Sequence, residues 1–260
     1  MTSCRRLALV AMVVALVAAA CGGSDETTTT GAEAGATATT AAATTTTPST
    51  TSDASATTTT MPETTTSSTL AGEPIDFFPQ VGDMLFVVGV AHDDTLNVRV
   101  APGIFNAIVD TLDPTGDTIA NGIARDLGQA IWVEHNTGAA VGWSNSAYLA
   151  FLGGTDDATA EVVALLGEFP TADSMEALGL IVADSLASTE PVSFIVMTVA
   201  PTEGDLHEVT YDVIGLGDDS VYGYRLHVFG QPVTDGFSLQ SVERTFLCGR
   251  GVTEDGELCV

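Results

Sequence analysis

The sequence predicts a mainly β and α+β protein: a small β-barrel at residues 80–152, then an α+β domain at residues 155–260, both behind a disordered tether. Three observations support this prediction. Residues 82–152 consist of short β-type runs separated by turn residues. After Gly153 and Gly154, the apolar residues follow helical spacing. Four longer β-type runs complete the chain, so we expect two helices followed by a four-stranded antiparallel sheet, with the helices on one face.

The first 20 residues have the parts of an export signal. Arg5 and Arg6 form a positively charged start, and residues 7–20 are an unbroken apolar run. A membrane-spanning helix needs about 20 apolar residues, so this run is too short to remain as a span. It ends in small residues that lead directly to Cys21.

The segment LVAAACG, which contains Cys21, resembles the lipobox of bacterial lipoprotein signals. The resemblance implies that a diacylglyceryl group is attached to Cys21 and that residues 1–20 are removed as a signal peptide. The mature chain would then be anchored to a cell membrane by lipid, facing the extracytoplasmic side. The alternative is an ordinary secretory signal that is cut nearby and leaves Cys21 as a free thiol.

Residues 21–73 have the composition of a tether. Between positions 27 and 70, 21 of 44 residues are Thr, and most of the others are Ala, Ser, Gly, Pro and Glu. Such a segment has almost nothing to bury and is predicted to be disordered. As a flexible coil it would hold the folded part on the order of 35–40 Å from the membrane.

The chain is strongly acidic. Its formal net charge is −27, and it contains no lysine. Removal of the signal takes away Arg5 and Arg6 but no acidic residue, which leaves a net charge of −29. Nucleic acid and anionic lipid head groups are therefore excluded as expected partners, because like charges repel. A solubilising surface is the commoner reason for such a charge; attraction to cations or to a basic partner is the alternative.

Two cysteines remain after the signal and the lipidation site. Cys248 and Cys259 flank a glycine-rich segment near the end of the chain. Outside the cytoplasm a lone pair this close is expected to form a disulfide. Closing this loop would stabilise the fold by about 3 kcal/mol in the chain-entropy model. A metal site would require two further ligands, and the nearby sequence offers none.

Four motifs of the first β region occur in the order of a known family. Residues 96–103, LNVRVAPG, resemble the LNVRSGPG opening of bacterial SH3-like (SH3b) domains. IVDTL at residues 108–112, Trp132-Val133 and GWSNSAYL at residues 142–149 are similar to the later family motifs. The resemblance implies an SH3-like β-barrel that docks to a cell-wall peptide or to a protein partner.

Four residues of these motifs are candidate ligand-binding residues. Trp132, Trp143 and Tyr148 have large amphipathic rings that can fill the end of a barrel or line a groove. Core packing is the default for a tryptophan in a small domain, and ligand contact is the alternative. Asn97, in the LNVR motif, completes the candidate set.

The second region combines helical and β patterns. Residues 156–166 read as one helix, and Ser174 resembles the cap of a second helix that contains Leu178, Val182 and Leu186. Residues 192–199, 206–216, 221–229 and 237–248 read as strands. The segment after Val242, which includes both cysteines, resembles the tails of uncharacterised actinobacterial envelope proteins.

The sequence discloses no reaction. No pair of its four histidines has metal-binding helical spacing, and no catalytic serine motif is present. His207-Glu208 and His227 lie on predicted strands that could pair through the intervening hairpin and form an acid–base couple, although an exposed strand histidine is far more often just a surface residue. Acid pairs such as Asp218-Asp219 fit solvated turns better than calcium loops. Arg225, Arg244 and Arg250 could cluster as an anion site or pair with neighbouring acids, which is the better expectation.

We therefore expect a non-catalytic cell-envelope lipoprotein without cofactor or metal. Its SH3-like region would dock to a cell-wall peptide or to an envelope protein. The alternatives are an accessory or enzyme of cell-wall remodelling, or a small-ligand carrier that uses the C-terminal region.

Overall fold

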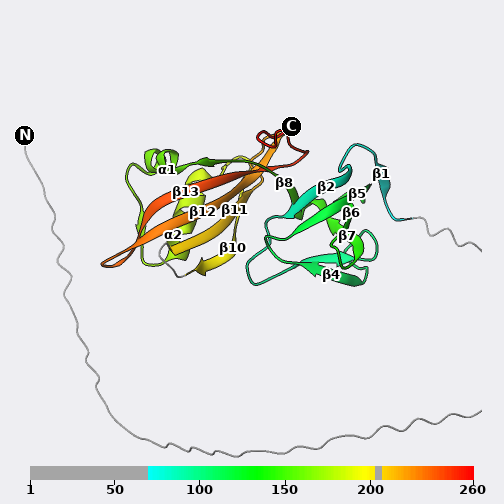
Figure 1. The fold of residues 1–260 in the computed structure, drawn as a ribbon, viewed down its shortest axis with the longest axis horizontal. Helices are drawn as coiled ribbons and strands as arrows, with labels where there is room; N and C mark the ends of the chain where they lie inside the picture. The colour runs from blue at the N-terminus through cyan, green and yellow to red at the C-terminus, as the bar shows by residue number, and fades with distance from the viewer. Residues whose placement is uncertain (1–69, 203–206) are drawn as a thin grey trace, which may run out of the picture. The chain divides into compact units, whose positions relative to one another are not determined.

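A computed structural model describes residues 70–202 and 207–260, which form mainly antiparallel β structure (Figure 1). Eight strands come before either helix, and a short 3-10 helix, η1 (Ser146–Tyr148), directly precedes the eighth. These strands are β1 (Glu73–Ile75), β2 (Val81–Val87), β3 (Leu96–Arg99), β4 (Ile108–Leu112), β5 (Asp117–Asp126), β6 (Ile131–Asn136), β7 (Val141–Asn145) and β8 (Leu149–Asp157).

The later half of the described chain adds two helices and the remaining strands. The elements are α1 (Thr159–Leu166), β9 (Thr171–Ala172), α2 (Met175–Leu186), β10 (Phe194–Thr202), β11 (His207–Ile214), β12 (Val221–Val233) and β13 (Gly236–Cys248). Among the described residues, no helix combines the length and the apolar character needed to cross a bilayer. The predicted signal peptide, Cys21 and all but the last few residues of the predicted tether lie outside the described residues.

All the strands of the described residues belong to one 13-stranded antiparallel sheet. Its main path is β10-β11-β12-β13-β8-β2-β5-β6-β7-β3-β4, while β1 pairs with β5 and β9 pairs with β13. Strand β8 connects the two halves of this path. Its first residues, Leu149 and Ala150, pair with β2, whereas residues from Phe151 onward pair with β13.

The fold class predicted from the sequence is wrong. The described chain is mostly β, and its two helices follow eight strands of the same sheet, so there is no small barrel followed by a helix-led α+β domain. The prediction treats Gly153 and Gly154 as a break, but both lie inside β8. A Cβ added to Gly153 would lie 3.0 Å from Cys248 Sγ, and one added to Gly154 would lie 2.9 Å from Glu257 O. These glycines therefore let the C-terminal segment approach β8.

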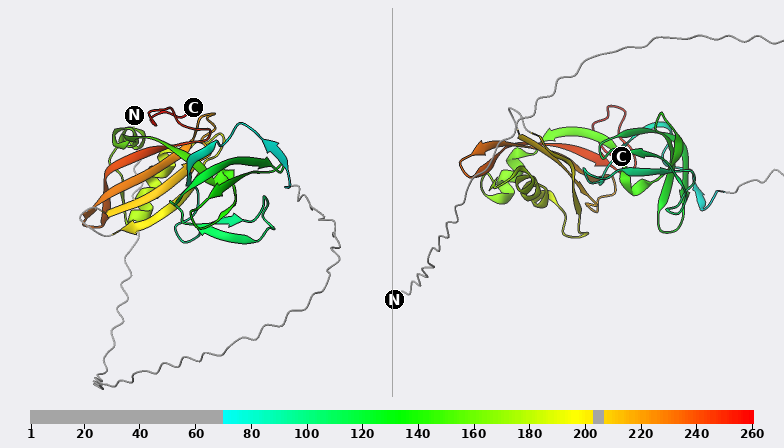
Figure 2. Two further views of the ribbon diagram at one scale, coloured as in Figure 1. Left: turned by 45° about the vertical axis from the view of Figure 1, so that its right-hand side comes forward. Right: turned by 90° about the horizontal axis from the view of Figure 1, so that it is seen from below.

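Helix α2 covers one face of the second half of the sheet. It begins after Ser174, whose side chain accepts a hydrogen bond from Ala177 N at 3.2 Å. It packs against β10, β11 and β12, and Figure 2 shows both helices on the same side of these strands. The buried core on this side contains Leu178 and Val182 of α2 with Val209 and Leu226 of the sheet. No helix of the described residues lies on the opposite face of β10–β12.

A buried ion pair ties β11 and β12 to the end of β2. Asp212 is fully buried, and Arg225 Nε and Nη2 donate to its two carboxylate oxygens at 2.8 and 2.9 Å. Arg225 Nη2 also donates to Val87 O at 2.8 Å. The backbone N–H of Gly89 donates to Asp212 Oδ2 at 2.9 Å. The pair therefore satisfies backbone groups that lie more than a hundred positions earlier in the chain.

We predict that Asp212→Ala lowers the free energy of unfolding by about 3–5 kcal/mol, because it leaves the Arg225 charge buried without its counter-ion. Denaturant unfolding followed by circular dichroism measures this change. Arg250→Ala is the matched control. Its pair with Asp219 is exposed and 3.9 Å long, so its loss should change stability by less than about 1 kcal/mol. Equal effects of the two substitutions would contradict the role assigned to the buried pair.

Candidate functional site

Three of the four candidate ligand residues line one groove, which we call the Tyr148 groove and which has a volume of about 500 Å³. Asn97 comes from β3, Trp132 from β6, and Tyr148 from the end of η1. The groove is lined by Gly89, Val90, Ala91, Asp94, Thr95, Leu96, Asn97, Arg99, Ile104, Trp132, Asn145, Tyr148 and Val196.

Helix η1 fixes the position of Tyr148 at the rim of the groove. The Asn145 side chain accepts a hydrogen bond from Ala147 N at 3.0 Å and so caps this helix. The carbonyl of Tyr148 accepts from Val88 N at 3.0 Å, which holds the backbone against the segment after β2. Tyr148 nevertheless remains 40% exposed. A rigid backbone with an exposed amphipathic ring suits ligand contact.

The two tryptophans have more buried positions. Trp132 is almost entirely buried and reaches the groove from its floor. Trp143 is only 2% exposed and does not line the groove. It lies on β7, where it pairs with Arg99 and with Glu134. Truncation of the Trp143 side chain would therefore lower the stability of the fold, and a loss of binding in that variant would not identify Trp143 as a ligand contact.

The loop between β3 and β4 forms an apolar edge of the groove. Arg99 Nη1 donates to Asn106 O at 2.7 Å, and Asn106 Nδ2 donates to Pro102 O at 2.8 Å, so the loop is braced internally. It presents Ile104 to the groove and leaves Phe105 97% exposed. Sequence reasoning misses these two residues. The sequence does carry a signal for them: two apolar residues stand side by side in a turn segment, where core packing does not require apolar side chains.

The opposite wall of the groove belongs to β10. Val196 lines the groove, and the N–H of His92 donates to Met197 O at 2.9 Å, which ties the loop after β2 to this strand. Strand β10 stands at one end of the sheet path, so its outer edge pairs with no strand among the described residues. The groove therefore combines aromatic and apolar side chains with the edge of a strand.

A buried histidine, His135, lies in a network of hydroxyls that reaches the backbone of Asn97. His135 Nδ1 lies 2.8 Å from Thr118 Oγ1, and its Nε2 lies 2.9 Å from Ser144 Oγ. Thr118 Oγ1 also donates to Asn136 O at 2.9 Å, and Ser144 Oγ donates to Asn97 O at 3.0 Å. The second of these carbonyls belongs to a candidate ligand residue, so the network supports the backbone of β3 at the groove.

The network has one proton too few when His135 is neutral. A neutral imidazole and two hydroxyls supply three hydrogens for these four contacts. A protonated ring would satisfy all four, but burial disfavours the charge and lowers the pKa of His135 to about 4. The negative charge of Asp110 opposes this lowering only in part.

We predict that His135 makes the fold less stable in acid. Its folded-state pKa of about 4 lies below the ordinary value of 6.5, so its contribution is complete above pH 6.5 and is lost as the pH falls towards 4. The free energy of unfolding should drop by about 2–3 kcal/mol from this group between pH 7.5 and pH 4.5. Denaturant titrations of the native chain and of His135→Gln at both pH values measure this difference. The same pH dependence in both proteins would refute the assignment to His135.

The remaining histidines and acids form no metal cluster in the described part of the chain. Glu208 and His227 are in contact, with His227 Nδ1 2.6 Å from Glu208 Oε1. His207 instead packs edge-on against Phe237, with ring centroids 4.9 Å apart.

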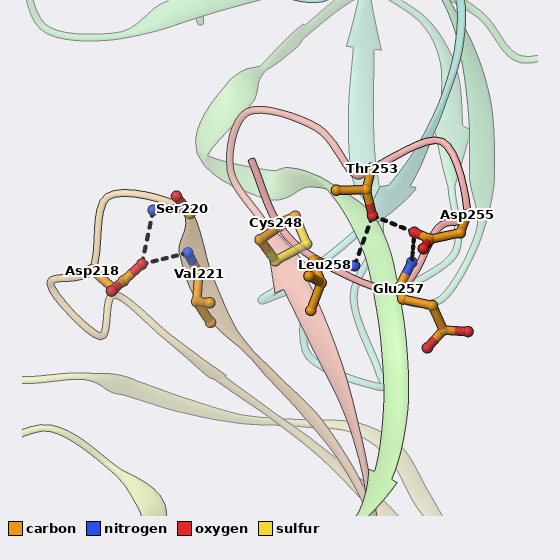
Figure 3. Close-up of a disulfide and its surroundings, with 9 residues drawn as sticks. Asp218, Ser220, Val221, Cys248, Thr253, Asp255, Glu257 and Leu258 are labelled. Atoms are coloured by element: carbon orange, nitrogen blue, oxygen red, sulfur yellow. Dashed lines mark hydrogen bonds between the residues drawn. A yellow bond between two sulfur atoms is a disulfide. The ribbon is translucent and has the colours of Figure 1, made fainter.

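The predicted disulfide between Cys248 and Cys259 is confirmed, with the two Cα atoms 5.1 Å apart. Figure 3 shows it between turns that are closed by carboxylates. Asp218 Oδ1 accepts hydrogen bonds from Ser220 N and Val221 N at 2.8 and 2.7 Å. These backbone donors lower the pKa of Asp218. Asp218 thus serves as a turn residue, as its sequence context predicts.

A larger cavity of about 690 Å³ lies elsewhere and contains none of the four candidate residues. Its lining includes Phe77 and Phe78 from the segment after β1, together with Tyr222 and Arg250. Only Asn145 lines both this cavity and the Tyr148 groove. We therefore take the Tyr148 groove as the candidate functional site.

Comparisons of the chain with models of protein families, with curated proteins and with solved structures gave no match.

Proposed function

We propose that this chain is a lipid-anchored, non-catalytic protein of the cell envelope that docks a cell-wall peptide in the Tyr148 groove. The lipobox-like segment before Gly22 and the Thr-rich segment after it support the anchor and its extracytoplasmic location. The resemblance of residues 96–103 and 142–149 to SH3b motifs supports the docking role.

The observation that carries the proposal is the convergence of Asn97, Trp132 and Tyr148 on one groove. An amide, an indole and a phenol offer hydrogen bonds beside flat apolar surface, which is what a short peptide requires. Val196 of β10 adds apolar surface on the other side of the groove, next to the loop that His92 N ties to Met197 O. The side chains of the groove thus offer a short peptide both hydrogen-bond partners and apolar contact.

The charge of the chain favours a peptide that carries free amines. Each of the five arginines in the described residues bonds to the chain itself. The pairs are Arg99 with Asn106 O, Arg125 with Gly72 O, Arg225 with Asp212, Arg244 with Asp156 and Glu161, and Arg250 with Asp219. Arg225, Arg244 and Arg250 therefore pair with neighbouring acids, as the sequence favours. Asp94 brings a carboxylate to the groove, so an ammonium group of the ligand would find an acceptor there.

We predict that Tyr148→Ala weakens binding to purified cell wall by about tenfold, because it removes the exposed ring at the rim. The measurement is co-sedimentation of residues 22–260, which include every described residue, with wall at increasing concentration. Phe169→Ala is the matched control, since Phe169 is an exposed aromatic residue (55%) outside the groove. Equal binding by both variants, with folding verified by circular dichroism, would count against the groove. Failure of the native chain to bind wall would overturn the wall-peptide ligand.

We also predict that Cys21 carries the lipid. In cells of the source bacterium fed a labelled fatty acid, the native chain should take up label and sediment with membranes. Cys21→Ser should lose the label and the membrane association, because a single thiol is the attachment point. Persistent labelling of Cys21→Ser would contradict the lipobox interpretation.

A further inference from the structure

The face of the sheet opposite α1 and α2 carries charged and hydroxyl side chains from β11, β12 and β13. Alternation along β11 and β12 sends Val209 and Leu226 to the helix side and leaves Glu208, Arg225 and His227 on the opposite side. A hollow of about 280 Å³ lies on this face and is lined by all three of these residues. We call it the His227 hollow. It shares no lining residue with the Tyr148 groove.

Glu208 orients the imidazole of His227. The Nδ1 atom of His227 lies 2.6 Å from Glu208 Oε1, and about a third of each side chain is exposed. This contact engages Nδ1, whereas Nε2 makes no hydrogen bond to the described residues. A carboxylate that holds one ring nitrogen fixes the direction in which the other nitrogen can bond. His227 therefore offers a positioned nitrogen to a ligand.

Arg225 offers a donor on the same face. Its Nε and Nη2 are engaged by Asp212 and Val87 O, whereas Nη1 has no hydrogen bond to the residues that the structure describes. The side chain is more than nine-tenths buried and lines the hollow. Hydroxyls of Thr202, Thr210 and Thr245 belong to the lining residues as well. The hollow thus contains both donors and acceptors.

The charges in and around the hollow argue against a charged ligand. Arg225 is neutralised by Asp212, and Glu208 faces His227, so these four groups sum to zero or to −1, according to the proton on His227. Glu243 lies opposite His227 on β13 and adds a further negative charge. An oxyanion would meet no net positive charge here. A cation would meet the guanidinium of Arg225.

We propose that the His227 hollow binds one ring of a neutral sugar. A sugar hydroxyl both donates and accepts, so adjacent hydroxyls can accept from Arg225 and donate to Glu208 or His227. Inorganic phosphate carries a negative charge for which the hollow offers no net positive charge, and an ammonium only donates, so neither satisfies the set. The volume is near the lower end of small-molecule sites, about 300 Å³, so it suits a single ring.

The test is an NMR titration of residues 22–260. It follows the chemical shifts of the histidine imidazole signals as each probe is added. D-glucose, N-acetylglucosamine and inorganic phosphate are the probes. We expect either sugar to shift the His227 signals saturably with a Kd on the order of 1 mM, because a single sugar ring makes few contacts. Phosphate at the same concentrations should leave them unchanged.

Two variants locate the binding. Glu208→Gln keeps the shape of the side chain but removes its charge, and we expect it to weaken sugar binding by about tenfold. His207→Gln is the matched control on the helix side of the same strand, and it should change the Kd by less than about twofold. If Glu208→Gln does not fold, Thr245→Val provides the same comparison. The proposal would be overturned if neither sugar shifted the His227 signals, or if phosphate shifted them. Undiminished sugar binding by Glu208→Gln, or by Thr245→Val in its place, would also overturn it.

Discussion

The buried pair between Arg225 and Asp212 is the interaction on which the arrangement of the two halves depends. A buried charge is costly unless it is paired and hydrogen-bonded, and here the bonds extend beyond the pair to Val87 O and Gly89 N. The segment that follows β2 is thereby fixed against β11 and β12. Strand β8, which pairs with β2 at one end and with β13 at the other, makes the same connection through backbone hydrogen bonds.

Both candidate binding regions lie beside this connection. Gly89 and the residues after it form part of the Tyr148 groove, and Arg225 lines the His227 hollow on the face without helices. Helices α1 and α2 take up the opposite face, where the apolar side chains of β11 and β12 are buried. On the face without these helices, Glu208 and His227 remain about one-third exposed. The excess of acids in the chain makes an anionic partner unfavourable, and in the His227 hollow Asp212 already neutralises Arg225.

Local signals in the sequence predict part of this structure. Cys248 and Cys259 form the expected disulfide, which the sequence predicts because they are a lone, closely spaced pair in a chain with a predicted export signal. The predicted fold class is wrong because Gly153 and Gly154 look like a linker in the sequence. In the structure they lie in β8 and permit the close approach of Cys248 and Glu257 to that strand. Aromatic residues mark the groove, but burial of Trp143 and exposure of Tyr148 follow from tertiary packing. The pairing of Arg225 with Val87 O spans too many residues for any local pattern to predict.

Hydrogen exchange at the amide of Gly89 tests most directly whether the buried pair joins the two halves. This N–H bonds to a carboxylate across the chain, so it should exchange only when β11 and β12 unfold as well. Its opening free energy should then equal that of the Leu226 amide in β12. Exchange of Gly89 with a much smaller opening free energy, while Leu226 stays protected, would show that the first half opens independently and would contradict the role given to the pair.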